Sequence, residues 1–313
     1  MSLAAETHRG LLPLEVEFDA TAAAIGDDEA RARLRLPLTR LGGLAAERLF
    51  AAARPLGQRE GFRIFSADDL LIGWSLQPVG DDLSAAGREL YRRLLAATAG
   101  RRLCRIWNYV PQINAVRAGV ENYRAFNAGR AGAFQAALGA DYPDALPSAS
   151  AVGCRGETLA AVFVAAEHSP RHCENPEQLP AYRYPDEHGP CPPSFARATI
   201  ASWRGRPLVF ISGTAAITGH ATVAPGSFAA QAACTLDNLR LISRTAGLGD
   251  DLGASRSFER HFKIYLRHGA DLPAAKARLS GELLRPDDRV IWLETDLCRA
   301  ELDLEIEATL IGC

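Results

Sequence analysis

A row of acidic residues near the C-terminus is the first feature of this sequence that could carry out chemistry. The stretch LDLEIEATL, residues 302–310, alternates strictly between apolar and polar residues. In a β-strand the apolar residues share one face, and the other face carries Asp303, Glu305, Glu307 and Thr309. These acids either face water on an edge strand or line a site in which one buried carboxyl group stays protonated and acts as a general acid.

Several arginines lie among aromatic, proline and small residues. Arg183 is in AYRYP, Arg197 is in SFARAT, and Arg124 and Arg130 are in ENYRAFNAGRAGAF. A partly desolvated guanidinium binds carboxylates strongly and cannot be deprotonated. The simplest use of several such groups is recognition of a small dicarboxylate.

Two further motifs have more than one interpretation. The run ISGTAAITGH (211–220) is either a strand that ends in a turn or a close backbone approach to a ligand, with Thr214 offering a hydroxyl. It contains no phosphate-binding fingerprint, so nucleotide binding is not predicted. His168, His172 and Cys173 in HSPRHC match no standard zinc spacing, and we therefore expect no metal.

The composition is that of a globular protein. Of 313 residues, 48% are hydrophobic and 23% charged, and 35 Lys and Arg nearly balance 37 Asp and Glu, which argues against a nucleic-acid or anionic-membrane partner. The seven cysteines are scattered without a CxxC pair, as is typical of a reducing cytoplasm. No stretch is apolar enough for a membrane span or a secretory signal, so we expect a cytoplasmic protein.

The order of the elements predicts an α+β fold. Periodicity indicates helices over about 82–97, 119–138, 227–245 and 271–284, each next to strand-like runs such as 103–110. Both halves read β-β-α-β-α, which indicates a weak internal duplication. We expect two such units, over 1–147 and 148–313, with the acidic strand in the second.

At this point the sequence resembles a known family, the chorismatases, which release pyruvate from chorismate. The resemblance is carried by motifs that occur in order over the last two thirds of the chain: RIWNYVPQINA (105–115), ENYRAFNAGRAGAF (121–134), ENP…AYRYP…GPCPPSFARAT (174–199), ISGTAAITGH (211–220) and LCRAELDLEIEA (297–308). It implies a fold similar to the YjgF/RidA proteins, active sites in clefts between such units, and no metal or organic cofactor. The oligomeric state is left open between a monomer and a homotrimer.

The resemblance also implies roles for individual residues. Glu305 matches the acid that protonates the enol ether of chorismate, with Glu307 as the fallback. Arg130, Arg183 and Arg197 would bind the substrate carboxylates, with Tyr182 and Tyr123 as orienting hydroxyls. Two positions vary with product: Cys298 resembles the enzymes that form 3-hydroxybenzoate, some of which also yield 4-hydroxybenzoate, whereas Ala216 is less informative. Cys191 departs from the family pattern, which has a basic residue there.

Three other functions stay open. Some family members hydrolyse chorismate to a dihydroxycyclohexadiene carboxylate. An imine or enamine deaminase of the RidA type would use the same strand glutamate. A module that binds a small anion without turnover would follow if Glu305 were solvated.

Overall fold

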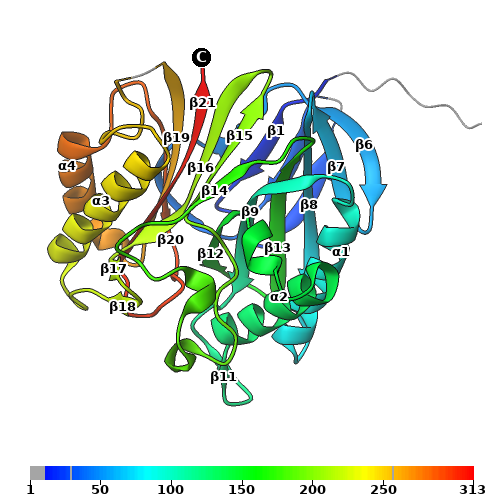
Figure 1. The fold of residues 1–313 in the computed structure, drawn as a ribbon, viewed down its shortest axis with the longest axis horizontal. Helices are drawn as coiled ribbons and strands as arrows, with labels where there is room; N and C mark the ends of the chain where they lie inside the picture. Colours follow the sequence, from blue (N-terminus) through cyan, green and yellow to red (C-terminus); the bar gives the residue numbers. More distant parts are fainter. Residues whose placement is uncertain (1–10, 29, 256) are drawn as a thin grey trace, which may run out of the picture.

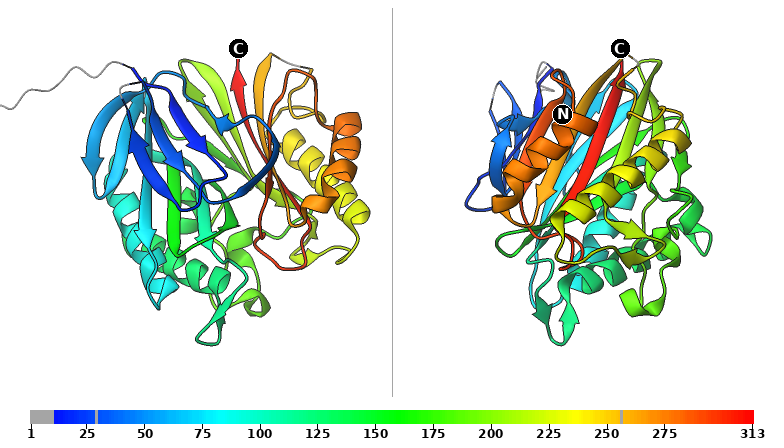
Figure 2. Two further views of the ribbon diagram at one scale, coloured as in Figure 1. Left: turned by 180° about the vertical axis from the view of Figure 1, so that it is seen from behind. Right: turned by 90° about the vertical axis from the view of Figure 1, so that its left-hand side faces the viewer.

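The computed structural model describes residues 11–28, 30–255 and 257–313. Figures 1 and 2 show two β-sheets that face each other, each covered on its outer face by a pair of helices. Within the described residues the helices are α1 (Leu83–Ala97), α2 (Asn122–Leu138), α3 (Phe228–Thr245) and α4 (Leu272–Glu282). All four coincide to within a few residues with predicted helices.

The first sheet has the strand order β12-β9-β13-β8-β7-β6. Its strands are β6 (Arg54–Arg59), β7 (Phe62–Ala67), β8 (Leu70–Pro78), β9 (Arg102–Pro111), β12 (Ser148–Cys154) and β13 (Thr158–Ala166). Helices α1 and α2 cover one face and bury Leu90, Phe126 and Phe163 in a common core. Asp82 caps α1 by accepting a hydrogen bond from the Ala85 amide at 2.9 Å, and Gly129 lets α2 approach the Ser84 carbonyl closely.

The second sheet has the order β14-β15-β16-β21-β19-β20-β4. Its strands are β4 (Thr39–Gly43), β14 (Arg171–Cys173), β15 (Ala198–Trp203), β16 (Arg206–Ala215), β19 (Phe258–Leu266), β20 (Arg289–Glu294) and β21 (Leu304–Gly312). Helices α3 and α4 cover its outer face, where Leu236, Leu279 and Ile306 pack together. The predicted acidic strand is therefore central in this sheet and not an edge strand.

The two sheets repeat one topology. The order β7-β8-β13-β9-β12 in the first corresponds to β15-β16-β21-β19-β20 in the second. In each sheet one pair of neighbouring strands is parallel, β9 with β12 in the first and β19 with β20 in the second. The strand that comes last in the sequence, β13 in the first sheet and β21 in the second, runs antiparallel to both of its neighbours. The predicted α+β class and internal duplication are confirmed.

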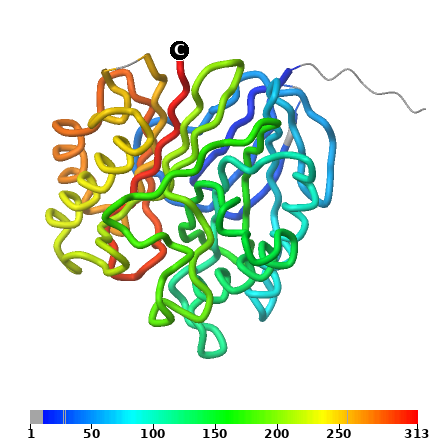
Figure 3. The backbone as a smooth tube through the Cα atoms, in the orientation of Figure 1, coloured from blue at the N-terminus to red at the C-terminus, as the bar shows by residue number. Residues whose placement is uncertain are grey.

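The division between the units differs from the expected one. Strands β12 and β13 follow residue 147 in the sequence, but they pair with β9 and β8 in the first sheet. The segment that joins the halves, green in Figure 3, begins only after β13. We therefore propose that the first unit extends to Ala166, because a strand belongs to the unit whose sheet it completes.

Four of the five strands before residue 50 form a separate small sheet, and the fifth, β4, belongs to the second large sheet. The small sheet has the order β2-β3-β1-β5, with β1 (Leu14–Glu17), β2 (Ala24–Asp27), β3 (Ala32–Arg35) and β5 (Ala46–Glu47). Its apolar residues join the core between the two large sheets, where Trp107 and Phe210 meet edge to face at 6.0 Å.

The alternation of β21 places its two glutamates inside the protein. Leu304, Ile306 and Leu310 face the helices, whereas Glu305 and Glu307 face the first sheet. Glu305 is 3% exposed and Glu307 is 2% exposed. The interpretation of this face as a solvated one is wrong for both residues.

No helix in the described part of the chain is long and apolar enough to cross a membrane. The seven cysteines carry free thiols.

Candidate active site

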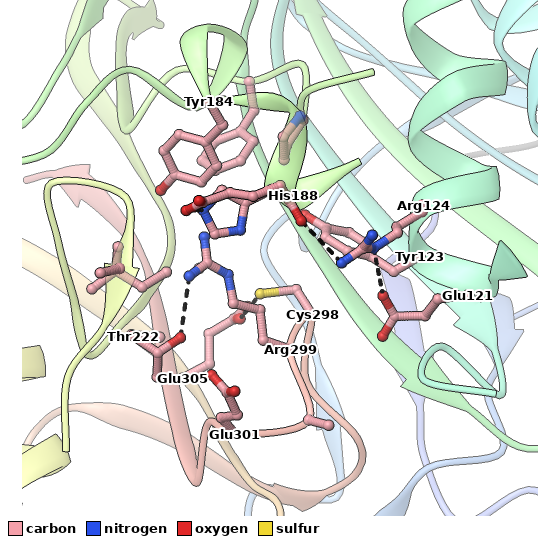
Figure 4. Close-up of a pocket in the computed structure, with 18 of the residues that line it drawn as sticks. Glu121, Tyr123, Arg124, Tyr184, His188, Thr222, Cys298, Arg299, Glu301 and Glu305 are labelled. Atoms are coloured by element: carbon pink, nitrogen blue, oxygen red, sulfur yellow. Dashed lines mark hydrogen bonds and ion pairs between the residues drawn. The ribbon is translucent and has the colours of Figure 1, made fainter. Parts of the chain in front are cut away.

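A cavity of about 510 Å³ opens where the two units meet. Figure 4 shows side chains that converge on it from α2, from the 3₁₀ turn η3 (Asp186–His188), from β21 and from the loop before β21. A deeper void of about 20 Å³ shares Tyr123, Cys298 and Glu305 with the cavity and reaches Arg130. Both units therefore contribute to one site within a single chain.

Glu305 lies in the wall of this cavity and is kept as a neutral acid. Burial, together with the negative charge of Glu307, raises the pKa of Glu305 to about 8. Its Oε1 is buried without a hydrogen-bond partner, and its Oε2 has only a weak contact with the Cys298 thiol at 3.9 Å. A carboxyl group in this state can give its proton to a ligand in the cavity.

Gly213 provides the space for the Glu305 carboxyl group. It lies on β16, opposite β21, where the register between the strands shifts between Ile211 and Thr214. A β-carbon at Gly213 would overlap Glu305 Oε1. The Gly213 amide donates a hydrogen bond to Ser150 Oγ at 3.1 Å, which fixes this bulge against the first sheet.

Glu307 is held in the opposite protonation state. It accepts hydrogen bonds from Arg105 at 2.7 Å, from Trp107 Nε1 at 2.8 Å and from the Ser150 hydroxyl, and it pairs with Lys263 Nζ at 2.9 Å. Burial alone would raise the pKa of Glu307, but Lys263 and Arg105 outweigh it and hold that pKa below its usual value. Glu307 is therefore an anion at neutral pH, and its lone pairs are already occupied.

Cys298 reaches Glu305 from the loop that joins β20 to β21. Burial, with Glu305 nearby, raises the pKa of the Cys298 thiol to about 12, so it stays protonated. Arg267 holds this loop, since it donates to the Leu302 and Arg299 carbonyls at 2.7 Å each and pairs with Asp296 at 2.6 Å. The position of the thiol thus depends on a side chain outside the cavity.

Two of the three predicted arginines reach the site. Arg130 is 1% exposed on α2, with its Nη2 donating to Asn127 at 2.8 Å. Arg197 is 5% exposed, donates to the Tyr184 hydroxyl at 2.7 Å and stacks near Phe195. In each, Nε is buried without a partner. Donors of this kind are available to an anionic ligand.

Tyr123 lies beside the same groups. It is near the start of α2 and lines both the cavity and the deeper void. Burial raises the pKa of its phenol, so that it remains a hydroxyl donor. The structure therefore brings together five predicted site residues, namely Glu305, Cys298, Arg130, Arg197 and Tyr123.

The other four predicted site residues do not line the cavity. Arg183 is exposed on the 3₁₀ turn η2 (Ala181–Arg183), and its guanidinium lies over the Tyr182 ring. Tyr182 packs against the core between the first sheet and helices α1 and α2. Thr214 donates to the Ser212 carbonyl at 2.9 Å, and Ala216 is buried in the core between the sheets. Neighbouring residues in the sequence line the cavity instead. Tyr184 takes the place of Tyr182 and Arg183, and Gly213 and Ala215 take the place of Thr214 and Ala216.

Sequence reasoning missed Tyr184 and Arg299. Tyr184 accepts from Arg197, and Arg299 donates to Thr222 Oγ1 at 3.1 Å while its guanidinium lies 5.4 Å from the Tyr184 ring. Figure 4 shows Arg299 projecting into the cavity above Glu305. Arg299 directly follows Cys298, so the same motif could have indicated it.

Comparison with known proteins defines the class of this chain. A family model described as "Chorismatase FkbO/Hyg5-like, N-terminal" matches residues 49–165. A chorismatase crystal structure superimposes with a TM-score of 0.85 over 99% of this chain and 95% of that one, at 31% identity. The shared fold is that of an enzyme.

Sequence relatives give the family. A chorismatase of Streptomyces rapamycinicus is 37% identical over 81% of this chain and 78% of its own length. A 3-hydroxybenzoate synthase of Streptomyces hygroscopicus is 36% identical over 66% of this chain and 63% of its own. The chain belongs to the chorismatase family, as its motifs predicted.

Proposed function

We propose that this enzyme cleaves the enol ether of chorismate by protonation from Glu305 and releases pyruvate. The proton of the Glu305 carboxyl group is transferred to the terminal methylene carbon of the enolpyruvyl group. The double bond supplies the electron pair, and the adjacent carbon becomes an oxocarbenium-like centre. The carboxylate left on Glu305 stabilises this positive charge. The bond between the ring carbon and the ether oxygen then breaks, its electron pair stays on the oxygen that becomes the carbonyl of pyruvate, and the ring loses a proton to form the hydroxybenzoate.

The observation that carries the proposal is the state of Glu305. An enol ether carbon is a poor base, so its protonation requires an acid that is still protonated at neutral pH and is shielded from water. Glu305 meets both conditions, with a pKa of about 8, 3% exposure and a free oxygen at the cavity wall. Glu307 is equally buried but fails the first condition, because its pKa is lowered and it is ionised, with its oxygens already hydrogen-bonded.

The cations of the cavity suit a substrate with two carboxylates. Arg130 lines the deeper void and Arg197 lines the main cavity, Glu305 lines both, and each arginine has a buried Nε without a partner. Arg299 and Arg124 line the more open part. We assign the carboxylate next to the reacting enol to the first pair and the ring carboxylate to the second, because the enol must lie against Glu305.

We propose 3-hydroxybenzoate as the main aromatic product. Chorismate divides into pyruvate and a hydroxybenzoate without any net addition of water, whereas the diene diol requires one water molecule. The Cys298 thiol, neutral and only 3.9 Å from Glu305 Oε2, occupies space in which a polar side chain would hold a water molecule. The 3-hydroxybenzoate synthase among the relatives supports the same product.

The test is incubation of the purified protein with chorismate in ¹⁸O-labelled water, with chromatography of the products and an assay for pyruvate. We expect pyruvate in equal amount to 3-hydroxybenzoate. Pyruvate with the diene diol would overturn the product assignment but not the role of Glu305. Absence of pyruvate would overturn the proposed function.

The Cys298→Ser variant tests the role of the thiol separately. A hydroxyl anchors water better than a thiol does, so we expect a shift of product towards the diene diol with pyruvate release retained. Unchanged products would show that Cys298 does not control the entry of water.

A further inference from the structure

A cluster of two histidines and one glutamate lies at the mouth of the cavity and has no part in the proposed chemistry. Glu187 and His188 belong to η3, and His220 lies in the turn between the short strands β17 (Ile217–Thr218) and β18 (Ala221–Thr222). Glu187 and His188 line one side of the mouth, and Ala221 and Thr222 line the other. Figure 4 shows His188 between Tyr184 and Arg299.

The three side chains direct one ligand atom each at a common point. His188 Nε2 is 3.0 Å from His220 Nδ1, and Glu187 Oε1 is 3.3 Å from the first nitrogen and 3.1 Å from the second. Ligand atoms 2.0–2.1 Å from a tetrahedral zinc ion lie about 3.3–3.4 Å apart. The observed triangle needs to widen by only a few tenths of an ångström to form one face of that tetrahedron.

We propose that Glu187, His188 and His220 bind one divalent transition-metal ion of the zinc class, and that the bound ion inhibits the enzyme. Two imidazoles and one carboxylate favour such an ion over Mg²⁺ or Ca²⁺, which prefer oxygen ligands. The three residues leave a fourth position for water or for a carboxylate of the substrate. This is a different site from the HSPRHC motif, in which His172 contacts Thr199 at 3.0 Å and not a second metal ligand.

The backbone around the cluster is held in place. The Gly219 amide donates to the Glu177 carbonyl and the Leu179 amide donates to the Gly219 carbonyl, each at 2.9 Å, which fixes the turn that carries His220. Arg124 Nη2 donates to the Glu187 carbonyl at 3.2 Å and fixes η3. A metal ion would therefore find its ligands nearly in position, which reduces the entropic cost of binding.

Inhibition follows from where these segments lie. The ion would lock the existing contact between η3 and the β17–β18 turn, beside the entrance that the substrate must pass. Arg124 and Arg299, which line the same mouth, oppose a second positive charge there. We therefore expect an affinity of roughly 1–100 µM, weaker than that of a structural zinc site.

The experiment first measures binding without any activity. Chelator-treated protein is titrated with Co²⁺, whose visible absorption is strong in four-coordinate sites, and the Co²⁺ is then displaced with Zn²⁺. We expect one ion per chain for the wild type and for His268→Ala, a matched control at an exposed histidine elsewhere. His220→Ala and Glu187→Gln should weaken binding at least about tenfold, since each removes one of three ligands. No binding up to about 100 µM, or binding unchanged in His220→Ala, would overturn the site.

The second measurement rests on the proposed function. The rate of pyruvate release with Zn²⁺ is divided by the rate with chelator for each variant. We expect a ratio well below one for the wild type and for His268→Ala, and a ratio near one for His220→Ala. Binding without inhibition would overturn the effect on the entrance and leave the site standing. If chorismate is not a substrate, the Co²⁺ titration still decides whether the site exists, so the two failures are distinguishable.

Discussion

Glu305 and Glu307 are the same residue type, two positions apart on one face of one strand, yet their surroundings keep one neutral and the other ionised. The end of β21 at Glu305 faces a cavity, a weakly bonding thiol and the space left by Gly213. Glu307 instead contacts four polar side chains that occupy its carboxylate oxygens, namely Lys263, Arg105, Trp107 and Ser150. Hydrogen bonds and cations, and not burial, therefore separate the acid from the anion.

The comparison also explains how the two residues act together. The fixed anion at Glu307 is one cause of the raised pKa of Glu305, because a second negative charge nearby is unfavourable. Lys263 also pairs with Glu47 at 2.7 Å, so the network extends from the second sheet to the small N-terminal sheet. A structural ion-pair network thus adds to the effect of burial on the protonation state of the proposed acid.

The largest expected effect is that of Glu305→Gln on turnover. Glutamine keeps the size of glutamate but cannot donate a carboxylic proton, so we expect a loss of pyruvate release of at least about 10³-fold. Circular dichroism should show an unchanged fold. Asp303→Asn, a carboxyl group two residues before Glu305 and just outside β21, is the matched control and should retain activity. Retained turnover in Glu305→Gln would contradict the proposed role.

The next effect is that of Glu307→Gln on stability. This change leaves Lys263 and Arg105 as buried cations with one partner fewer, which we expect to lower the free energy of unfolding by about 3–5 kcal/mol. Urea unfolding followed by circular dichroism measures it. A change below about 1 kcal/mol would show that the network does not depend on the charge of Glu307.

Glu305 should itself cost stability at alkaline pH. Its pKa is raised from about 4.5 to about 8 on folding, so the folded state keeps a proton that the unfolded state loses between these values. The contribution of Glu305 to the free energy of unfolding of the wild type is therefore fully present below about pH 4.5. It is lost progressively as the pH rises to about 8. Glu305→Gln should be more stable than the wild type by about 2–4 kcal/mol at pH 8.5, with the difference shrinking towards pH 5. A constant difference across this range would contradict the raised pKa.

The smallest effect is the pH dependence of the rate. Because the protonated form of Glu305 is the active one, kcat/KM for chorismate should fall about tenfold per pH unit above a pKa near 8. Steady-state rates between pH 6 and pH 10 measure this limb. A rate that rises across pH 8 would show that a deprotonated base, and not this acid, limits the reaction.

The sequence predicted much of this fold because periodicity reports burial. The four helices and the alternation of β21 follow from apolar spacing, and the repeated β-β-α-β-α order indicated the duplication. We place the proposed boundary after β13 and not at residue 147, because sheet membership depends on long-range pairing, which the sequences of β12 and β13 do not reveal locally. The strands before residue 44 are short and bounded by loops, so they carried no clear period.

The site was predictable where one motif sets both the residue and its direction. Glu305, Arg130, Arg197 and Tyr123 lie on a strand, on a helix or next to one, whose faces can be deduced, whereas Cys298 lies in the loop before β21 and was indicated by the family motif. Tyr182 and Arg183 lie on a 3₁₀ turn, where a shift of one or two residues changes which side chain points inward. On β16, the register shift between Ile211 and Thr214 likewise changes which side chains point into the cavity.

The strand topology of the two units has a further consequence. Strand β13, the counterpart of β21, is apolar along its length, whereas β9 and β12 supply the groups that hold Glu307. The duplicated copy has become a scaffold for the one that carries the acid. Since a single polypeptide joins both walls of the cavity, their effective concentration is fixed, and dilution of the enzyme cannot separate them.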